Sequence, residues 1–261
     1  MNLLTWGRRL LTAVALPLAL LTVWWLLTAH STSFFWPPLS SILRVFPETW
    51  FGERITTDVL PSLGRLGTGY LLALVIGTAA GVSIGLSPVL RALTEPTLEF
   101  FRAIPPPVLV PVIALFAGYT GSTSKIITIT IGCIWPILLN TVEGVRALDE
   151  VVLDTARCYH LRRRTRLVHV ILRGASPQIA AGARQALSIA VILMVISELF
   201  GANHGLGASV VQFQRSFAIP QMWTGIIVLG LLGVALSAVF RTVEHFTLAW
   251  YRGVRDADRG A

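Results

Sequence analysis

Residues 143–177 read EGVRALDEVVLDTARCYHLRRRTRLVHVILRGASP, and this polar stretch lies between long apolar runs. In its first half, apolar and small residues recur at i, i+3, i+4, i+7 and i+8, the spacing of one helix face. These residues are Leu148, Val151, Val152, Thr155 and Ala156. After Tyr159-His160-Leu161 a second helical pattern begins, with arginines on its remaining face. We therefore predict two short helices joined by a turn, lying beneath a membrane rather than crossing it.

The rest of the chain has the composition of an all-α membrane protein. Of its 261 residues, 54% are hydrophobic and 13% are charged, whereas soluble domains carry about 25% charged residues. A bilayer core requires roughly 20 apolar residues in a helix. Within one domain covering 1–261, we predict six transmembrane helices, at about 10–29, 66–87, 100–118, 124–142, 178–200 and 222–240. The third opens with Pro105-Pro106-Pro107, so we expect irregular backbone at its start.

Positive charge predicts the orientation of the chain. With six spans, both termini and residues 143–177 lie on the same side of the membrane. The segments on that side contain sixteen of the 21 Lys and Arg residues, among them Arg8, Arg9, Arg252, Arg255 and Arg259. Because cationic loops remain in the cytoplasm, we expect both termini there. The same rule accounts for the net charge of +8 without a nucleic-acid partner. The first run exceeds the 7–15 residues of a signal-peptide core, so we predict a retained first span.

The motifs in and around residues 143–177 resemble a known family. Asp154-Thr155-Ala156, then His160, then Val170-Ile171-Leu172 is similar to the loop of ABC importer permeases that reads Glu-Ala-Ala, a turn glycine and Ile-x-Leu-Pro. The resemblance extends over about residues 35–250. Further segments resemble the branch that handles sulfonates, taurine, nitrate and thiamine precursors, namely Phe35-Trp36-Pro37-Pro38, Arg102-Ala103-Ile104-Pro105-Pro106, Pro136-Ile137-Leu138-Leu139-Asn140-Thr141 and Gly201-Ala202-Asn203-His204-Gly205-Leu206-Gly207.

This resemblance implies a type I ABC importer permease fold, multi-pass in the bacterial inner membrane, with a cytoplasmic coupling helix. In that family the loop docks in a groove of the ATPase subunit, which assigns ATPase coupling to Val151, Val152, Asp154, Thr155, Ala156, His160 and Leu161. It also implies a homodimer, two ATP-binding cassette ATPase subunits that bind ATP and Mg, and an extracytoplasmic solute-binding protein. The implied solute is small and polar or anionic: a sulfonate, taurine, nitrate, an aromatic acid or a pyrimidine.

Three positions depart from the family's loop pattern. Asp154 replaces Glu and keeps the charge, His160 replaces the turn glycine, and Arg173 replaces the proline, for which Pro177 is a nearby substitute. Positive φ is rare outside glycine, although His is enriched among the exceptions. An Arg-rich amphipathic helix can also lie on anionic lipid, which is the alternative to ATPase docking.

A second set of candidate residues lies in or next to the apolar runs. Glu198 is the one carboxylate well inside a hydrophobic run, where an acid suggests a pathway or gate contact. The alternative is a polar contact at a helix end, where a side chain can also reach water. His204 and Arg215, in the following loop, are candidates to meet an anionic solute. Asn140 is a candidate pathway residue, although we expect Asn140 and Thr141 to hydrogen-bond between helices.

The sequence lacks the motifs of an enzyme. Its one lysine, Lys125, follows Ser124, so a phosphate-binding Gly-Lys-[Ser/Thr] motif is excluded and a partner must hydrolyse ATP. Cys133 and Cys158 have no CxxC neighbour, so we expect no metal and no cofactor on this chain. The rival class is an ATP-independent secondary transporter or channel, which predicts ion-coordinating groups at mid-membrane and inverted repeats. A purely structural membrane anchor is a third possibility, and the coupling-type loop argues against it.

Overall fold

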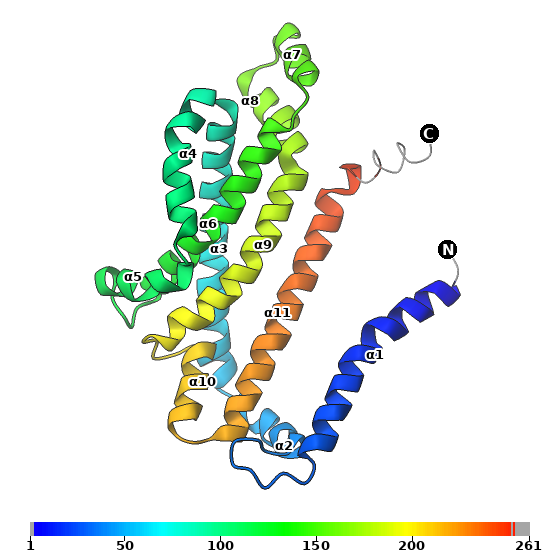
Figure 1. Cartoon of the computed structure of the whole chain (residues 1–261), viewed down its shortest axis with the longest axis vertical. Coiled ribbons are helices and arrows are strands. Elements are labelled where there is room, and N and C mark those ends of the chain that lie inside the picture. The colour runs from blue at the N-terminus through cyan, green and yellow to red at the C-terminus, as the bar shows by residue number, and fades with distance from the viewer. Residues whose placement is uncertain (1–2, 252, 254–261) are drawn as a thin grey trace.

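The computed structural model describes residues 3–251 and 253, with side chains from residue 15 onward, and the described part is helical without strands. Arg252, Arg255, Arg259 and the side chains of Arg8 and Arg9 lie outside it. The helices are α1 (Leu3–Thr28), α2 (Leu39–Trp50), α3 (Leu60–Leu86), α4 (Pro88–Ala103), α5 (Leu109–Ala117), α6 (Ser122–Arg146), α7 (Glu150–Cys158), α8 (Arg163–Thr165), α9 (Arg173–Leu199), α10 (Leu206–Arg215) and α11 (Ile219–Thr247). In Figure 1, α7 lies at one end of the bundle and α2 and α10 at the other, hereafter the α7 end and the α10 end.

Within the described residues, four continuous helical stretches are long and apolar enough to cross a bilayer, namely Ile55–Leu86, Ser122–Arg146, Arg163–Leu199 and Ile219–Thr247. They cover the predicted second, fourth, fifth and sixth spans. The predicted first span coincides with most of α1, in which Ala15–Thr28 is an apolar stretch. The chain in α1 runs toward the α10 end, and α11 runs from the α10 end back toward the α7 end (Figure 1). The all-helical membrane fold is therefore confirmed.

The third span differs from the prediction of one helix over 100–118. Here α4 ends at Ala103, and a second short helical stretch, Pro106–Ala117, leaves it at an angle of 76°. The physical reason is the run of three prolines, which lack N–H donors and force the preceding residue out of the helical region. Ile104 and Pro105 are accordingly extended, with ψ of 119° and 121°. Residues 100–103 thus end α4 instead of opening a span.

The second helix predicted after the Tyr159-His160-Leu161 turn is not a separate short helix. Helix α8, a π-helical segment at Arg166–Leu172 and α9 form one continuous stretch, Arg163–Leu199, of 37 residues. Its apolar residues Ile171 and Ala175 are buried beside Val82 of α3 and Val145 of α6, so packing extends the helix. Pro177 lies inside α9 and does not end it. Only α7 and its flanking turns remain as the connection between α6 and α9.

Glycines set the distance between α3 and α6, which run side by side in the same direction. A Cβ added at any of four α3 glycines would lie 2.6 to 3.0 Å from an α6 side chain: Gly69 from Ile129, Gly77 from Ile137, Gly81 from Thr141 and Gly85 from Val145. The four pairs follow one another in the same order along both helices, so α3 and α6 pack in a single register. In lipid, helices associate through such close packing because leaving the hydrocarbon gains no hydrophobic energy.

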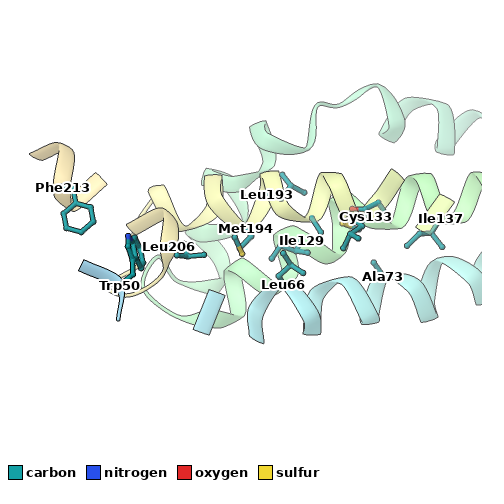
Figure 2. Packing of buried hydrophobic residues seen from close by; sticks show 13 residues of the cluster. Trp50, Leu66, Ala73, Ile129, Cys133, Ile137, Leu193, Met194, Leu206 and Phe213 are labelled. Atoms are coloured by element: carbon teal, nitrogen blue, oxygen red, sulfur yellow. Dashed lines mark hydrogen bonds between the residues drawn. The ribbon is translucent and has the colours of Figure 1, made fainter. Parts of the chain in front are cut away.

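Helix α9 packs on another side of α6, in the opposite direction. A Cβ at Gly182 would lie 2.6 Å from the Pro136 carbonyl oxygen, and one at Gly144 would lie 2.7 Å from Gln178 Cβ. Toward the α10 end, the buried apolar residues of α3, α6 and α9 continue to Trp50, Leu206 and Phe213 (Figure 2). The indole of Trp50 donates a hydrogen bond to the Thr224 hydroxyl at 2.8 Å, which ties α2 to α11.

The α3–α6 contact yields a stability prediction. In Gly81→Ala, the new methyl group would lie 2.6 Å from Thr141 Cβ and 2.8 Å from the Leu138 carbonyl oxygen, so the helices must separate. We expect a loss of about 1–3 kcal/mol, the usual cost of overpacking. The measurement is the thermal unfolding midpoint in detergent, with Gly67→Ala as control because a Cβ there meets nothing within 4 Å. Equal midpoints for the two variants would contradict the close contact.

Candidate functional site

The α7 end carries the first candidate site, a helix whose beginning is fixed by its own cap. The Asp149 carboxylate accepts a hydrogen bond from the Val151 N–H at 2.8 Å. Glu150 occupies the first turn, where a negative charge suits the helix dipole. Asp154 pairs with Arg157 at 2.7 Å, and both side chains are exposed. An exposed pair of this kind stabilises little, so Asp154 remains available to a partner.

The turn after α7 is made by His160 in the left-handed region, with φ of 48°. The His160 N–H donates to the Arg157 carbonyl at 2.9 Å, and the Leu161 N–H donates to the Ala156 carbonyl at 3.2 Å. These two bonds form a Schellman motif, the usual way to end a helix at a glycine. His160 therefore fills the backbone role that the resemblance gives to a turn glycine.

The predicted apolar face of α7 is divided between two directions. Ala156 is buried, and Leu148 and Leu153 pack against the buried cluster of Val82, Val145, Ile171 and Ala175. Outward-facing residues of the predicted set are Val151, 69% exposed, Val152, 49% exposed, Thr155 and Leu161. Ala156 therefore belongs to the packing of this chain, and the exposed valines form the surface that another subunit can reach.

The second candidate site, at the α10 end, is centred on Glu198. Its side chain is buried, with a residue exposure of 1%, so it does not reach water and instead makes polar contacts at the end of α9. One carboxylate oxygen accepts from the Arg65 guanidinium at 2.7 Å, and the Ser62 hydroxyl donates to the carboxylate at 2.7 Å. The other oxygen accepts from the Gly207 N–H at 3.0 Å. Charge and hydrogen bonds together offset the cost of burying this group.

The same side chains fasten the segment between α9 and α10. Arg65 also donates to the His204 carbonyl at 2.8 Å and to the Ser122 hydroxyl at 3.1 Å. Asp58 accepts from the Gly205 N–H at 3.0 Å, and the Ser62 hydroxyl accepts from the Leu206 N–H at 2.9 Å. We call Asp58, Ser62, Arg65 and Glu198 the polar cluster. It joins the start of α3, the start of α6, the end of α9 and the start of α10.

Gly205 is required by the shape of this cluster. Its φ of 138° is strained for other residues, and a Cβ there would lie 2.5 Å from a Glu198 carboxylate oxygen. Glu198 is recognisable from the sequence, whereas its partners were not predicted. The missed signal is the spacing of Asp58, Ser62 and Arg65 at i, i+4 and i+7, which places three polar groups on one helix face.

The side chains of the other predicted pathway residues make no contact with the Glu198 carboxylate in the hydrogen bonds of the described structure. His204 enters the cluster only through its carbonyl. The Asn140 amide donates to the Pro136 carbonyl at 2.7 Å, and the Thr141 hydroxyl donates to the Ile137 carbonyl at 2.7 Å, both within α6. The expected bonds between helices are thus replaced by bonds to the preceding turn, which short polar side chains in helices commonly make. Among the described residues, no group of three His, Cys, Asp or Glu side chains could hold a metal ion.

Beside the polar cluster lies a cavity of about 910 Å³, open to the surface. Its lining is Glu198, Leu199, Phe200, Gly201, Ala202, Asn203, Ala208, Val211, Gln212, Arg215 and Ser216. The Glu198 carboxylate in this lining is already paired with Arg65. The cavity therefore lies between the end of α9 and α10, and several of its lining side chains are polar.

The polar cluster yields the next prediction. Glu198→Ala leaves Arg65 buried without its counter-charge, and we expect a loss of about 3–5 kcal/mol of stability. Glu198→Gln keeps the shape and an acceptor, so its loss should be smaller. The control is Glu48→Ala on the exposed face of α2, expected within about 0.5 kcal/mol of wild type. Thermal unfolding in detergent measures all of these.

A double variant shows whether Arg65 and Glu198 stabilise the protein through their contact with each other or independently. If Arg65 and Glu198 act on each other, Arg65→Ala combined with Glu198→Ala should be less destabilised than the sum of the single variants. Strict additivity of the two losses would contradict the ion pair.

Comparison with known proteins gives a consistent picture. Residues 69–246 match the family model described as binding-protein-dependent transport system inner membrane component. The chain is 27% identical over 256 residues to the taurine transport system permease protein TauC of Escherichia coli, covering 95% of this chain and 93% of that protein. It is 27% identical over 214 residues to the putative aliphatic sulfonates transport permease protein SsuC of Bacillus subtilis, covering 82% and 77%. The bicarbonate transport system permease protein CmpB of Synechococcus elongatus is 29% identical over 192 residues, covering 73% and 69%.

Solved structures agree on the fold. A chain of the inward-facing MetNI methionine ABC transporter superposes with a TM-score of 0.62 at 19% identity, covering 73% of this chain and 94% of that one. A chain of an amino acid ABC transporter gives 0.53 at 16% identity, covering 82% and 96%. Two thirds of the sequence matches the family model, and helices, loop motif and fold agree with it. The chain therefore belongs to the binding-protein-dependent transport system inner membrane components and is the permease subunit of an ABC importer.

Proposed function

We propose that two copies of this chain form the membrane pathway of an importer driven by two ATP-binding cassette ATPase subunits, with an extracytoplasmic binding protein that delivers the solute. The ATPases bind ATP and Mg, and this chain binds neither. The observation that carries the proposal is α7, a capped helix that presents Val151 and Val152 to the surroundings beyond the ends of α6 and α9. Exposed valines on a short helix are suited to burial in a groove of another subunit.

In this proposal the α7 end faces the cytoplasm and the α10 end faces outward. Arg157 and the exposed arginines at 162–164 surround α7, in agreement with the rule for cytoplasmic loops. Val151, Val152, Asp154 and Thr155 contact the ATPase, whereas Ala156, His160 and Leu161 hold the shape of the turn. The alternative, α7 resting on anionic lipid, uses the same arginines and is distinguished by the coupling test below.

Helix continuity connects the two candidate sites. The stretch Arg163–Leu199 begins at the turn after α7 and ends beside Glu198. At 1.5 Å per residue its 37 residues extend about 55 Å, enough to cross the bilayer. A shift of α7 on ATP binding would therefore reach the polar cluster through one helix. We propose that Glu198 is a gate contact, held by Arg65 and Ser62 in the closed state and released on opening. Asn140 and His204 remain weaker pathway proposals, because neither lines the open cavity.

The proposed solute is small and polar or anionic. The relatives named for taurine, aliphatic sulfonates and bicarbonate support this class, and none of them identifies the solute of this chain. A binding assay on the partner binding protein identifies it.

The coupling surface yields a direct test. Val151→Asp places a charge where we expect a buried interface, so ATP-driven uptake by the reconstituted complex should fall at least tenfold while the subunit still reaches the membrane. The matched control is Val89→Asp at the start of α4, because Val89 and Val151 are both 69% exposed. Uptake at the wild-type rate in Val151→Asp would exclude α7 as the coupling element. Uptake without ATPase subunits would instead favour the rival class of secondary transporter.

The orientation has its own test. In a Cys158→Ser background, a cysteine at exposed Arg164 should resist a membrane-impermeant thiol reagent applied to intact cells, because it faces the cytoplasm. A cysteine at exposed Ser33, before α2, should be labelled under the same conditions. Permeabilised cells should label both. Labelling of Arg164→Cys in intact cells would reverse the proposed topology.

A further inference from the structure

The cavity beside the polar cluster contains three polar side chains that the chain itself does not use. Asn203, Gln212 and Arg215 all line it, and within the described residues none of their side chains makes a hydrogen bond or an ion pair. Two of them lie on α10, four and one residues before Ser216, and the third lies on the segment that the polar cluster fastens. Three uncommitted polar groups around one cavity indicate a place for a polar ligand.

The charge of the cavity is positive. Its one acid, Glu198, is neutralised by Arg65 and satisfied by Ser62 and Gly207, so it adds no free negative charge. Arg215 is the basic residue in the cavity lining, and its guanidinium makes no ion pair with a described acid. Its place in the last turn of α10 suits the helix dipole, which accounts for a basic residue there. That effect leaves the guanidinium donors unoccupied.

Guanidinium and amide donors together match an oxyanion. A planar guanidinium donates two parallel hydrogen bonds to a carboxylate, sulfonate or nitrate group. The Asn203 and Gln212 amides can donate further bonds or accept them from an amino group. A cavity of about 910 Å³ is much larger than such an ion, so water must fill the remainder. Weak binding with bridging water molecules suits a solute that has to pass through the site.

We propose that this cavity is a transit site for a small organic oxyanion, with Arg215 as its cation and Asn203 and Gln212 as its amide donors. The site rests on the proposed function, because it requires the α10 end to face outward. It goes beyond that proposal in assigning the residues that meet the solute before the Glu198 gate. Affinity is low, and selection among solutes is left to the binding protein.

The test measures the charge preference of the cavity with a cysteine reporter. Ser216→Cys in a Cys158→Ser background places a thiol in the lining and leaves the three proposed ligand groups intact. The purified complex is treated with a sulfonate-bearing and with a trimethylammonium-bearing methanethiosulfonate of equal size, with and without ATP and vanadate. Each rate is divided by that reagent's rate with a small free thiol, because a thiolate reacts intrinsically faster with a cationic reagent. After this normalisation we expect the anionic reagent to be favoured about fivefold, as for a unit charge roughly 8 Å away in water.

Variants and competitors assign that preference to the proposed groups. Adding Arg215→Gln should abolish the preference, adding Arg215→Lys should keep it, and adding Arg44→Gln, on the exposed face of α2, should not change it. Methanesulfonate should slow labelling by the anionic reagent, whereas neutral dimethyl sulfone should not. Equal normalised rates for the two reagents, no protection by methanesulfonate, or no labelling in either nucleotide state would overturn the transit site. The experiment monitors neither transport nor ATP hydrolysis, so its failure is distinct from a failure of ATPase coupling.

Discussion

Helix α6 packs closely between α3 and α9, and the geometry of both candidate sites follows from these two contacts. In lipid, two apolar helices gain no hydrophobic energy by meeting, so contact area and van der Waals packing must hold them together. Gly81 and Gly182 provide this by letting a neighbouring helix approach where a methyl group would not fit. With three helices locked in register, their ends are fixed as well, and both candidate sites are built at those ends.

The two sites differ in how they use polar groups. At the α7 end the ion pair of Asp154 and Arg157 is exposed and contributes little, so the surface is available for a partner. At the α10 end the pair of Arg65 and Glu198 is buried, and its loss would leave a charge without solvent. The first arrangement suits docking and the second suits a contact that has two defined states. One long helix, Arg163–Leu199, joins them.

Local sequence patterns predicted the turns and helices that are determined by residues close together in the sequence. The turn at His160 followed from the residues that flank it, and the apolar runs predicted most of the long helices. The predictions failed where distant residues decide. The segment at Arg166–Leu172 is amphipathic, but packing of Ile171 against Val82 and Val145 makes it continuous with α9. Glu198 is recognisable as an acid inside an apolar run. Its pairing with Arg65 is not, because the spacing of Asp58, Ser62 and Arg65 indicates a polar helix face without indicating which distant residue that face meets.

The distance along the chain between Arg65 and Glu198 has a consequence for synthesis. The two residues are 133 positions apart, so Arg65 enters the membrane well before its counter-charge exists. At 5–20 residues per second, the ribosome needs roughly 7 to 27 s to make the intervening chain. During that interval Arg65, near the beginning of α3, has to keep its guanidinium at the lipid headgroups. The ion pair can close only after α9 has been inserted, which makes the α10 end of the bundle the last part of the core to mature.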